Sequence, residues 1–232
     1  MSTFLERSQR ARLLAARNPA TAEILAFYSG VAEWQSVHSG ILCFDDLGDL
    51  LGSLVELTIQ TGPEVLLQSG QALDPADFRH RLADRWEAPG RPQTPDEFFI
   101  RVLLELYAAT LPEGLSCPWC AQPPALGCLT TQGDGLALHA LCPLCHRRRG
   151  VVRDRCPACN EDDQKQLVTY SSPEFPHLRL RACDRCRKYL TVVDLEKDIA
   201  AIPEVDEMAG VSLDLWARRT GYEKIHPNIV GI

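Results

Sequence analysis

Four Cys-x-x-Cys pairs occur between residues 117 and 186, and they constrain the fold of this chain more than any other feature of its sequence. Both sulfurs of such a pair can point to one ion, which leaves two corners of a tetrahedron for a second pair. Proline follows the first cysteine in three of the four pairs, where its fixed φ suits a tight turn. The pattern therefore predicts metal-binding turns. The pairs are Cys117–Cys120, Cys142–Cys145, Cys156–Cys159 and Cys183–Cys186.

The spacing of the pairs predicts how they combine. The first and third pairs start 39 residues apart, and the second and fourth start 41 residues apart. These near-equal distances indicate an internal repeat of turn, hairpin and turn. An interleaved pairing is the alternative, but it ignores the repeat. Sequential pairing gives a first site of Cys117, Cys120, Cys142 and Cys145, and a second site of Cys156, Cys159, Cys183 and Cys186.

A site with four thiolates has no open coordination position, so we expect a structural role rather than hydrolytic catalysis. We predict two metal ions per chain and no catalytic residue. Zinc is the usual ion in such sites, but four thiolates also hold iron, as in rubredoxin, and sulfur ligands alone do not decide between them. Four buried or redox-active pairs without metal would be the alternative, and the duplicated spacing argues against it.

Four other residues could act as ligands. Cys128 falls in a predicted strand and Cys43 in the distant helical half, so we expect both to be small core residues. His139 and His146 could substitute for a cysteine, but His146 starts the run HRRR and is expected to face solvent. Among the residues that follow the pairs, only Asn160 is expected to adopt a left-handed conformation comfortably.

Residues 1–110 have the periodicity of a helical bundle, because apolar side chains recur every three or four residues. Asp45 or Asp46 is expected to cap the third helix. Pro63 and Pro75 fit the first turn of the fourth and fifth helices. The last helix of this half is expected to start near Thr94.

From residue 111 onward, short β-prone runs alternate with turns. A single C-terminal helix and an irregular tail follow. We predict an α+β fold: an N-terminal helical bundle domain, two tandem rubredoxin-like or zinc-ribbon metal modules, and a C-terminal helix. Antiparallel strands are expected over residues 126–131, 136–141, 150–155, 167–171, 178–182 and 189–195, and the last helix over 203–221. The expected boundaries are 1–110, 111–150, 151–200 and 201–232.

The charge of the chain disfavours nucleic acid as a partner. The net charge is −7, from 24 Lys and Arg against 31 Asp and Glu. Residues 117–190 contain eleven Lys and Arg against seven Asp and Glu, but eight thiolates with two divalent ions would cancel this surplus. We therefore expect Arg147–Arg149 to offset thiolate charge rather than bind phosphate. The acidic flanking segments favour a protein as the partner.

The compartment is predicted from what the chain lacks. The N-terminal sequence has no continuous apolar run typical of a secretory signal. No stretch reaches the roughly 18 apolar residues that a membrane span needs. Clustered cysteines that hold metal stay reduced in the cytoplasm. We therefore expect a cytoplasmic location without a membrane span.

The cysteine pairs and their surroundings resemble those of a known family, the formate dehydrogenase accessory proteins called FdhE. The resemblance rests on CPWC, LHALCPLC, VVRDRCPAC and CDRC, continues through SLDL and GY, and covers roughly residues 111–222. It implies rubredoxin-type sites with the eight cysteines as ligands. Arg153 falls on a position where the family usually has Arg, whereas Arg149 stands where Trp is expected.

The resemblance also implies a function. Members of this family are cytoplasmic proteins that assist the maturation of respiratory formate dehydrogenase by acting on its catalytic subunit. It therefore implies an accessory factor that is not an enzyme. A rubredoxin-like electron-transfer protein is the alternative, and a zinc-ribbon nucleic-acid-binding protein is a third reading. The sequence does not indicate whether the chain forms oligomers.

Overall fold

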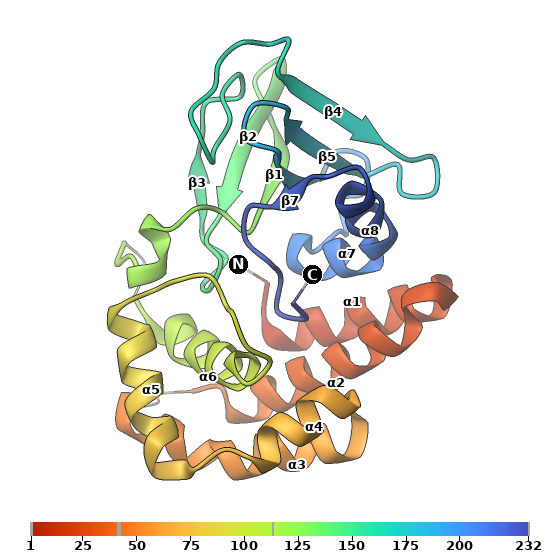
Figure 1. The fold of residues 1–232 in the computed structure, drawn as a ribbon. Coiled ribbons are helices and arrows are strands. Elements are labelled where there is room, and N and C mark those ends of the chain that lie inside the picture. The colour runs from red at the N-terminus through yellow and green to blue at the C-terminus, as the bar shows by residue number, and fades with distance from the viewer. Residues whose placement is uncertain (1, 41–42, 113, 232) are drawn as a thin grey trace.

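Helices and a twisted sheet form two layers, with the C-terminal helices between them (Figure 1). The computed structural model describes residues 2–40, 43–112 and 114–231. Met1 and Ile232, the outer ends of the first and last predicted segments, lie outside the described residues. The predicted α+β fold class is confirmed, and the division into four segments stays a prediction.

The helical layer packs around α6, which is buried over most of its length. Its Phe99, Val102 and Leu103 have no exposed surface. The layer consists of α1 (Phe4–Arg17), α2 (Ala22–His38), α3 (Leu51–Thr61), α4 (Glu64–Gln71), α5 (Pro75–Glu87) and α6 (Glu97–Thr110), with 3₁₀ turns η1 (Pro19–Thr21) and η2 (Phe44–Leu50).

Two of the predicted helix starts were wrong in detail. Asp45 and Asp46 lie inside the 3₁₀ turn η2, and α3 begins after them without a side-chain cap. Pro63 occupies the cap position before α4 rather than its first turn. Pro75 does open α5, where Asp74 accepts hydrogen bonds from two backbone amides of the first turn.

The sheet contains both halves of the predicted repeat. Its order is β3-β2-β1-β6-β5-β4, with β7 also paired to β6. Each repeat contributes three antiparallel strands, and the two sets meet where β1 pairs with β6 in parallel. The strands are β1 (Leu126–Gln132), β2 (Gly135–Leu141), β3 (Arg148–Gly150), β4 (Leu167–Ser171), β5 (Leu178–Cys183), β6 (Lys188–Asp194) and β7 (Glu223–Lys224).

The strand prediction failed at three points. The third strand covers residues 148–150 instead of 150–155. β7 follows the predicted end of the last helix at residue 221, where no strand was expected. The β1–β6 and β6–β7 pairs are parallel, whereas only antiparallel pairs were expected.

The C-terminal helix is divided in two. α7 (Pro203–Ala209) and α8 (Val211–Arg219) are separated by Gly210, where a Cβ would clash with the side chain of Leu178 on β5. Leu215 and Trp216 on α8 are exposed, whereas Val205 and Met208 on α7 are buried. None of the described helices is long and apolar enough to cross a membrane.

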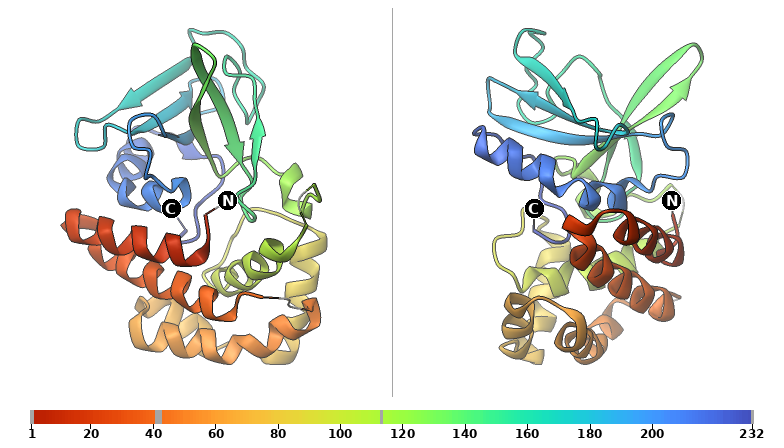
Figure 2. Two further views of the ribbon diagram at one scale, coloured as in Figure 1. Left: turned by 180° about the vertical axis from the view of Figure 1, so that it is seen from behind. Right: turned by 90° about the vertical axis from the view of Figure 1, so that its right-hand side faces the viewer.

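Buried ion pairs join the helical layer to the C-terminal helices. Arg10 on α1 donates from Nε to Asp206 of α7 at 2.9 Å. Arg7 Nε lies 2.9 Å from the carboxylate of Glu204, and both side chains are buried. The α1–α7 contact therefore fixes the sheet relative to the helices (Figure 2).

Candidate metal centres

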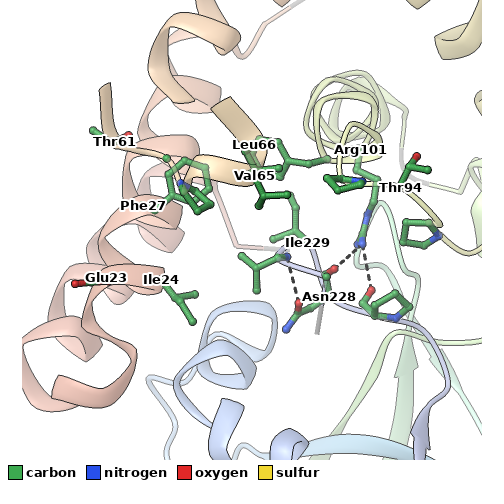
Figure 3. Close-up of a pocket in the computed structure, with 18 of the residues that line it drawn as sticks. Glu23, Ile24, Phe27, Thr61, Val65, Leu66, Thr94, Arg101, Asn228 and Ile229 are labelled. Carbon is green, nitrogen blue, oxygen red and sulfur yellow. Dashed lines mark hydrogen bonds between the residues drawn. The ribbon is translucent and has the colours of Figure 1, made fainter. Parts of the chain in front are cut away.

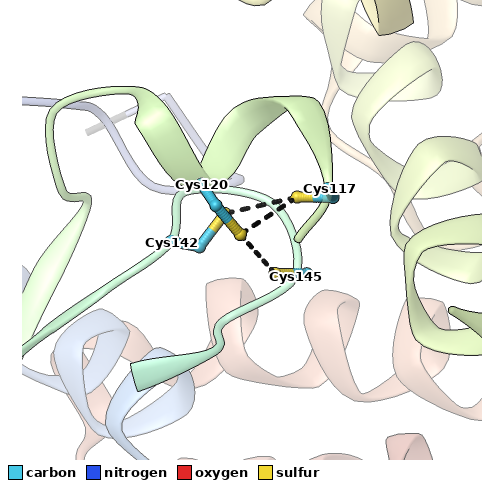
Figure 4. Close-up of side chains that lie close together, drawn as sticks. All are labelled: Cys117, Cys120, Cys142 and Cys145. Carbon is cyan, nitrogen blue, oxygen red and sulfur yellow. Dashed lines mark hydrogen bonds between the residues drawn. The ribbon is translucent and has the colours of Figure 1, made fainter. Parts of the chain in front are cut away.

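The four sulfurs of the first predicted site lie within 4.8 Å of one another (Figure 4). Cys117 Sγ is 3.6 Å from Sγ of both Cys120 and Cys142, and Cys120 Sγ is 3.5 Å from Cys145 Sγ. A disulfide would need about 2.0 Å. Metal–sulfur bonds of about 2.3 Å in a tetrahedron imply about 3.8 Å between sulfurs. The donor set and its spacing therefore fit a tetrahedral metal ion.

The backbone of two tight turns holds these sulfurs in place. Cys117 starts the 3₁₀ turn η3 (Pro118–Ala121), and its carbonyl accepts from the Cys120 amide at 3.0 Å. In the second turn the Cys142 carbonyl accepts from the His146 amide, and the Leu144 amide donates to Cys142 Sγ at 3.5 Å. The β1–β2 hairpin connects the two turns and brings them together.

The second cluster repeats this arrangement. Cys156 Sγ lies 3.8 Å from Cys186 Sγ, and Cys159 Sγ lies 3.8 Å from Cys183 Sγ. The Ala158 amide donates to Cys156 Sγ at 3.4 Å, which matches the contact of Leu144 in the first cluster. The sulfurs thus gather in the sequential arrangement, and their role as ligands stays a prediction.

Three of the four turns end in a left-handed residue. His146, Asn160 and Arg187 have φ values of 54°, 62° and 56°. Each donates its amide to the carbonyl of the first cysteine of its pair, and the turn closes only if the backbone reverses at this residue. Asn160, the residue expected to tolerate this conformation comfortably, adopts it, and His146 and Arg187 adopt it as well because tertiary closure of the turn outweighs the intrinsic cost.

The two clusters differ in exposure. In the first, Cys117, Cys142 and Cys145 are at most 4% exposed. In the second, Cys159 is exposed and Cys186 is half-buried. The first cluster lies between the sheet and the helices, whereas the second reaches the surface.

Burial makes bare thiolates unfavourable here. It is the main cause that raises the pKa of Cys186 to about 12, and it also raises the pKa of Cys156. Four ionised sulfurs at these distances require a nearby cation to balance their charge. A bound cation would supply the positive charge that four thiolates at these distances need.

His146 was wrongly expected to face solvent. It is buried, and its Nε2 lies 3.1 Å from Glu105 Oε1 on α6. Glu105 also accepts from Gln35 and lies near Arg7, so a buried polar network extends from the first cluster into the helical layer. The hydrogen bond from His146 is one cause that lowers the pKa of Glu105, against the opposing effect of burial. The sequence gives no local signal for this network, because Gln35, Glu105 and His146 come from distant segments.

The other candidate ligands lie away from the clusters. His139 faces Thr130 across the β1–β2 hairpin, with 3.0 Å between Nε2 and Oγ1. Cys128 is fully buried in β1, as expected of a core residue. Cys43 is exposed, so its assignment to the core was wrong.

A third group of potential ligands contains His177, Asp198 and Asp206. Arg10 donates to both carboxylates, and His177 Nε2 lies 3.0 Å from Asp206 Oδ1. The guanidinium of Arg10 therefore supplies the positive charge for these carboxylates. This group is a partly buried ion-pair network rather than a candidate metal site.

Two of the basic residues after the second turn donate hydrogen bonds to backbone carbonyls. Arg147 donates to the carbonyls of Leu111 and Pro112, and Arg149 donates to that of Gln122. These side chains hold the segments on either side of the first turn. Their guanidinium groups are thus used within the fold.

A pocket of about 780 Å³ lies away from the clusters, between α2, α4, α6 and the C-terminal segment (Figure 3). Its walls are mainly apolar and include Phe27, Leu66 and Ile229. Arg101 at its edge donates to the carbonyls of Pro227 and Asn228. None of the eight clustered cysteines lines this pocket.

Comparison with known proteins finds a family match in the C-terminal third of the chain. Residues 154–230, which include the second cluster, match the family described as FdhE, C-terminal domain. The protein FdhE homolog of Aquifex aeolicus is 31% identical over 116 residues, covering 50% of this chain and 41% of that protein. The homolog of Pseudomonas putida is 30% identical over 119 residues, covering 49% and 37%. The chain thus spans less than half the length of these two relatives.

The likeness of fold extends over the whole chain. The crystal structure of the FdhE protein from Pseudomonas aeruginosa superposes with a TM-score of 0.69 over 98% of this chain and 94% of that one, at 21% identity. The FdhE homolog of Shewanella oneidensis is 23% identical over 205 residues, covering 84% of this chain and 66% of that protein. The resemblance predicted from the cysteine pairs is therefore confirmed: residues 154–230 match the FdhE C-terminal domain, and the fold of the whole chain is similar to that of an FdhE protein.

Proposed function

We propose that this chain is a cytoplasmic accessory protein for the assembly of respiratory formate dehydrogenase. In this role it binds the catalytic subunit of that enzyme and holds one metal ion in each of its two four-cysteine clusters. It catalyses no reaction of its own. The observation that supports the proposal most directly is the occurrence of two complete tetrahedral sulfur sets within an FdhE fold.

The eight cysteines would act as the metal ligands. Cys117, Cys120, Cys142 and Cys145 would hold the first ion, and Cys156, Cys159, Cys183 and Cys186 the second. Four sulfurs leave no open coordination position, which favours a structural ion over a hydrolytic one. The bound ions would link the two turns of each cluster, and metal affinity would then contribute directly to folding.

The test is capture of the catalytic subunit of formate dehydrogenase by the purified, metal-loaded chain. We expect a complex that survives size-exclusion chromatography. A chain that carries two ions but captures no catalytic subunit, under either oxidising or reducing conditions, would contradict the proposed function. A variant with serine at both Cys159 and Cys186 should lose the second ion. Comparing its capture of the catalytic subunit with that of the wild type tests whether this ion is needed.

A second candidate function is electron transfer through iron at these clusters. The amide hydrogen bonds to Cys142 and Cys156 support it, because such bonds tune the potential of iron–sulfur sites. This function predicts a coloured protein whose visible absorption bleaches reversibly on reduction. A colourless zinc form that supports formate dehydrogenase assembly fully would exclude it.

A further inference from the structure

The outer side of α8 combines exposed apolar side chains with unpaired positive charge. Leu215 and Trp216 are 44% and 40% exposed. Arg219 follows them on the same side of the helix and makes no ion pair among the described residues. The only acid of α8, Asp214, points inward and is bonded to the buried Lys224. The exposed surface of this helix therefore has cations and no anion.

This surface continues to the second cysteine cluster. The rings of Trp216 and Tyr170 on β4 pack edge to face, with centroids 4.7 Å apart. Tyr170 shares a hydrogen bond with Tyr222, and Arg187 stacks on the Tyr222 ring at 3.9 Å. Arg187 directly follows Cys186. We call Tyr170, Arg187, Leu215, Trp216 and Arg219 the α8 face.

Stabilisation of the fold does not account for all of this surface. Arg219 in the last turn of α8 interacts favourably with the helix dipole, and Arg17 in the last turn of α1 makes the same kind of interaction. That effect gives no reason to leave Trp216 and Leu215 in solvent beside it. Trp, Tyr and Arg are the residue types that dominate binding energy in protein interfaces. The composition of the face is typical of a docking surface.

We propose that the α8 face binds an acidic segment of a protein partner. A carboxylate of that segment would pair with Arg219, because Arg187 already forms an ion pair with Asp184, and apolar side chains next to that carboxylate would pack on Leu215 and Trp216. Residues 1–116, with nine Lys and Arg against 16 Asp and Glu, would repel the same segment. The proposal rests on the proposed function because the partner that would bind this surface is the client enzyme, the catalytic subunit of formate dehydrogenase. A client bound here would lie next to the second cluster.

Charge-matched peptides test the surface independently of any client. The full chain is titrated with a short synthetic peptide of alternating Glu and Leu, and separately with its Lys–Leu counterpart, while the indole N–H signals are followed by NMR. We expect the acidic peptide to shift the signal of the exposed Trp216 and leave that of the buried Trp119 unchanged. Equal binding of both peptides, or no shift of Trp216, would overturn the proposal.

Helix α1 supplies matched control variants. Leu13 is 42% exposed and precedes Arg17 by four residues, as Leu215 precedes Arg219. Leu215→Ser and Arg219→Glu should each weaken binding of the acidic peptide by about tenfold or more, as expected of interface hot spots. Leu13→Ser and Arg17→Glu should leave it within about twofold, since exposed substitutions outside an interface have small effects. Equal losses in both pairs would show nonspecific binding and would overturn the proposal.

The same four variants separate this proposal from the proposed function. If the wild-type chain captures the catalytic subunit and the α8 variants capture it equally well, the α8 face is not the docking surface, although the proposed function stands. If the wild-type chain captures no catalytic subunit but binds the acidic peptide at Trp216, the proposed function fails and the docking surface stands. Selective loss of capture by the α8 variants supports both.

Discussion

Lys224 offers a test of how the C-terminal segment is fixed to the sheet. Its Nζ lies 2.5 Å from Glu207 Oε1 on α7 and 3.1 Å from Asp214 Oδ2 on α8, and all three side chains are only 1% exposed. Asp214 also accepts a hydrogen bond from Tyr189 of β6 at 2.7 Å. One cation thus serves two buried carboxylates, and the group ties β6 and β7 to both C-terminal helices.

Replacing Lys224 by Met removes the cation and leaves the carboxylates buried. Removing one partner of a buried ion pair typically costs about 3–5 kcal/mol. Burial and the neighbouring Asp214 raise the pKa of Glu207 to about 7, against the effect of Lys224, so Glu207 can take up a proton near neutral pH. The penalty then falls mainly on Asp214, which keeps its hydrogen bond to Tyr189. We therefore expect a loss near the lower limit, about 3 kcal/mol.

Urea unfolding followed by circular dichroism measures this loss in the metal-loaded chain at pH 7. Lys224→Met should unfold at a lower urea concentration than the wild type. Adding Asp214→Asn should recover part of the loss, because the amide is neutral and still accepts from Tyr189. A loss below about 1 kcal/mol for Lys224→Met, in the range of exposed ion pairs, would refute the reasoning.

Three further predictions follow from burial and exposure. Because the pKa of Glu207 rises from 4.5 to about 7 on folding, its contribution to stability is fully present below pH 4.5 and is lost as the pH rises to 7. The urea midpoints of the wild type and Glu207→Gln should therefore diverge as the pH rises over this range. The free energy of unfolding of the variant should increase relative to that of the wild type by up to about 3 kcal/mol; parallel curves would contradict this. A chelator should remove the ion held by Cys159 and Cys186 before the one held by Cys117 and its partners, seen as two phases in metal release; a single phase, or earlier loss from the buried cluster, would be inconsistent with the exposures. Cys128→Ala should leave two ions per chain by metal analysis and cost about 1 kcal/mol in urea unfolding, as a small buried cavity does; loss of an ion would make Cys128 a ligand.

The helices and the cysteine clusters were predictable because their signals are local. Apolar residues at helical spacing mark α1 and α2, and the near-equal distances between cysteine pairs indicate the pairing of the turns. Both signals depend on residues close in sequence or on a repeated spacing. A short-range pattern is enough for such features.

The features that the sequence did not reveal depend on contacts between distant segments. His146 is buried because Glu105 of α6 meets the second turn, and nothing in the run HRRR indicates this. The break at Gly210 follows from the close approach of Leu178, which lies on β5. The parallel β1–β6 pair joins strands of different repeats. Cys43 was assigned to the core because it lies in the helical half, but it directly precedes η2 and is exposed.

The number of metal ions per chain tests the central claim most directly. Native mass spectrometry of protein purified without chelator, combined with element analysis, counts the ions and identifies the metal. The structure predicts two ions per wild-type chain. Cys117→Ser should remove only the first ion and Cys156→Ser only the second. Fewer than two ions in the wild-type chain, or loss of both ions from either single variant in folded protein, would contradict two separate four-cysteine sites.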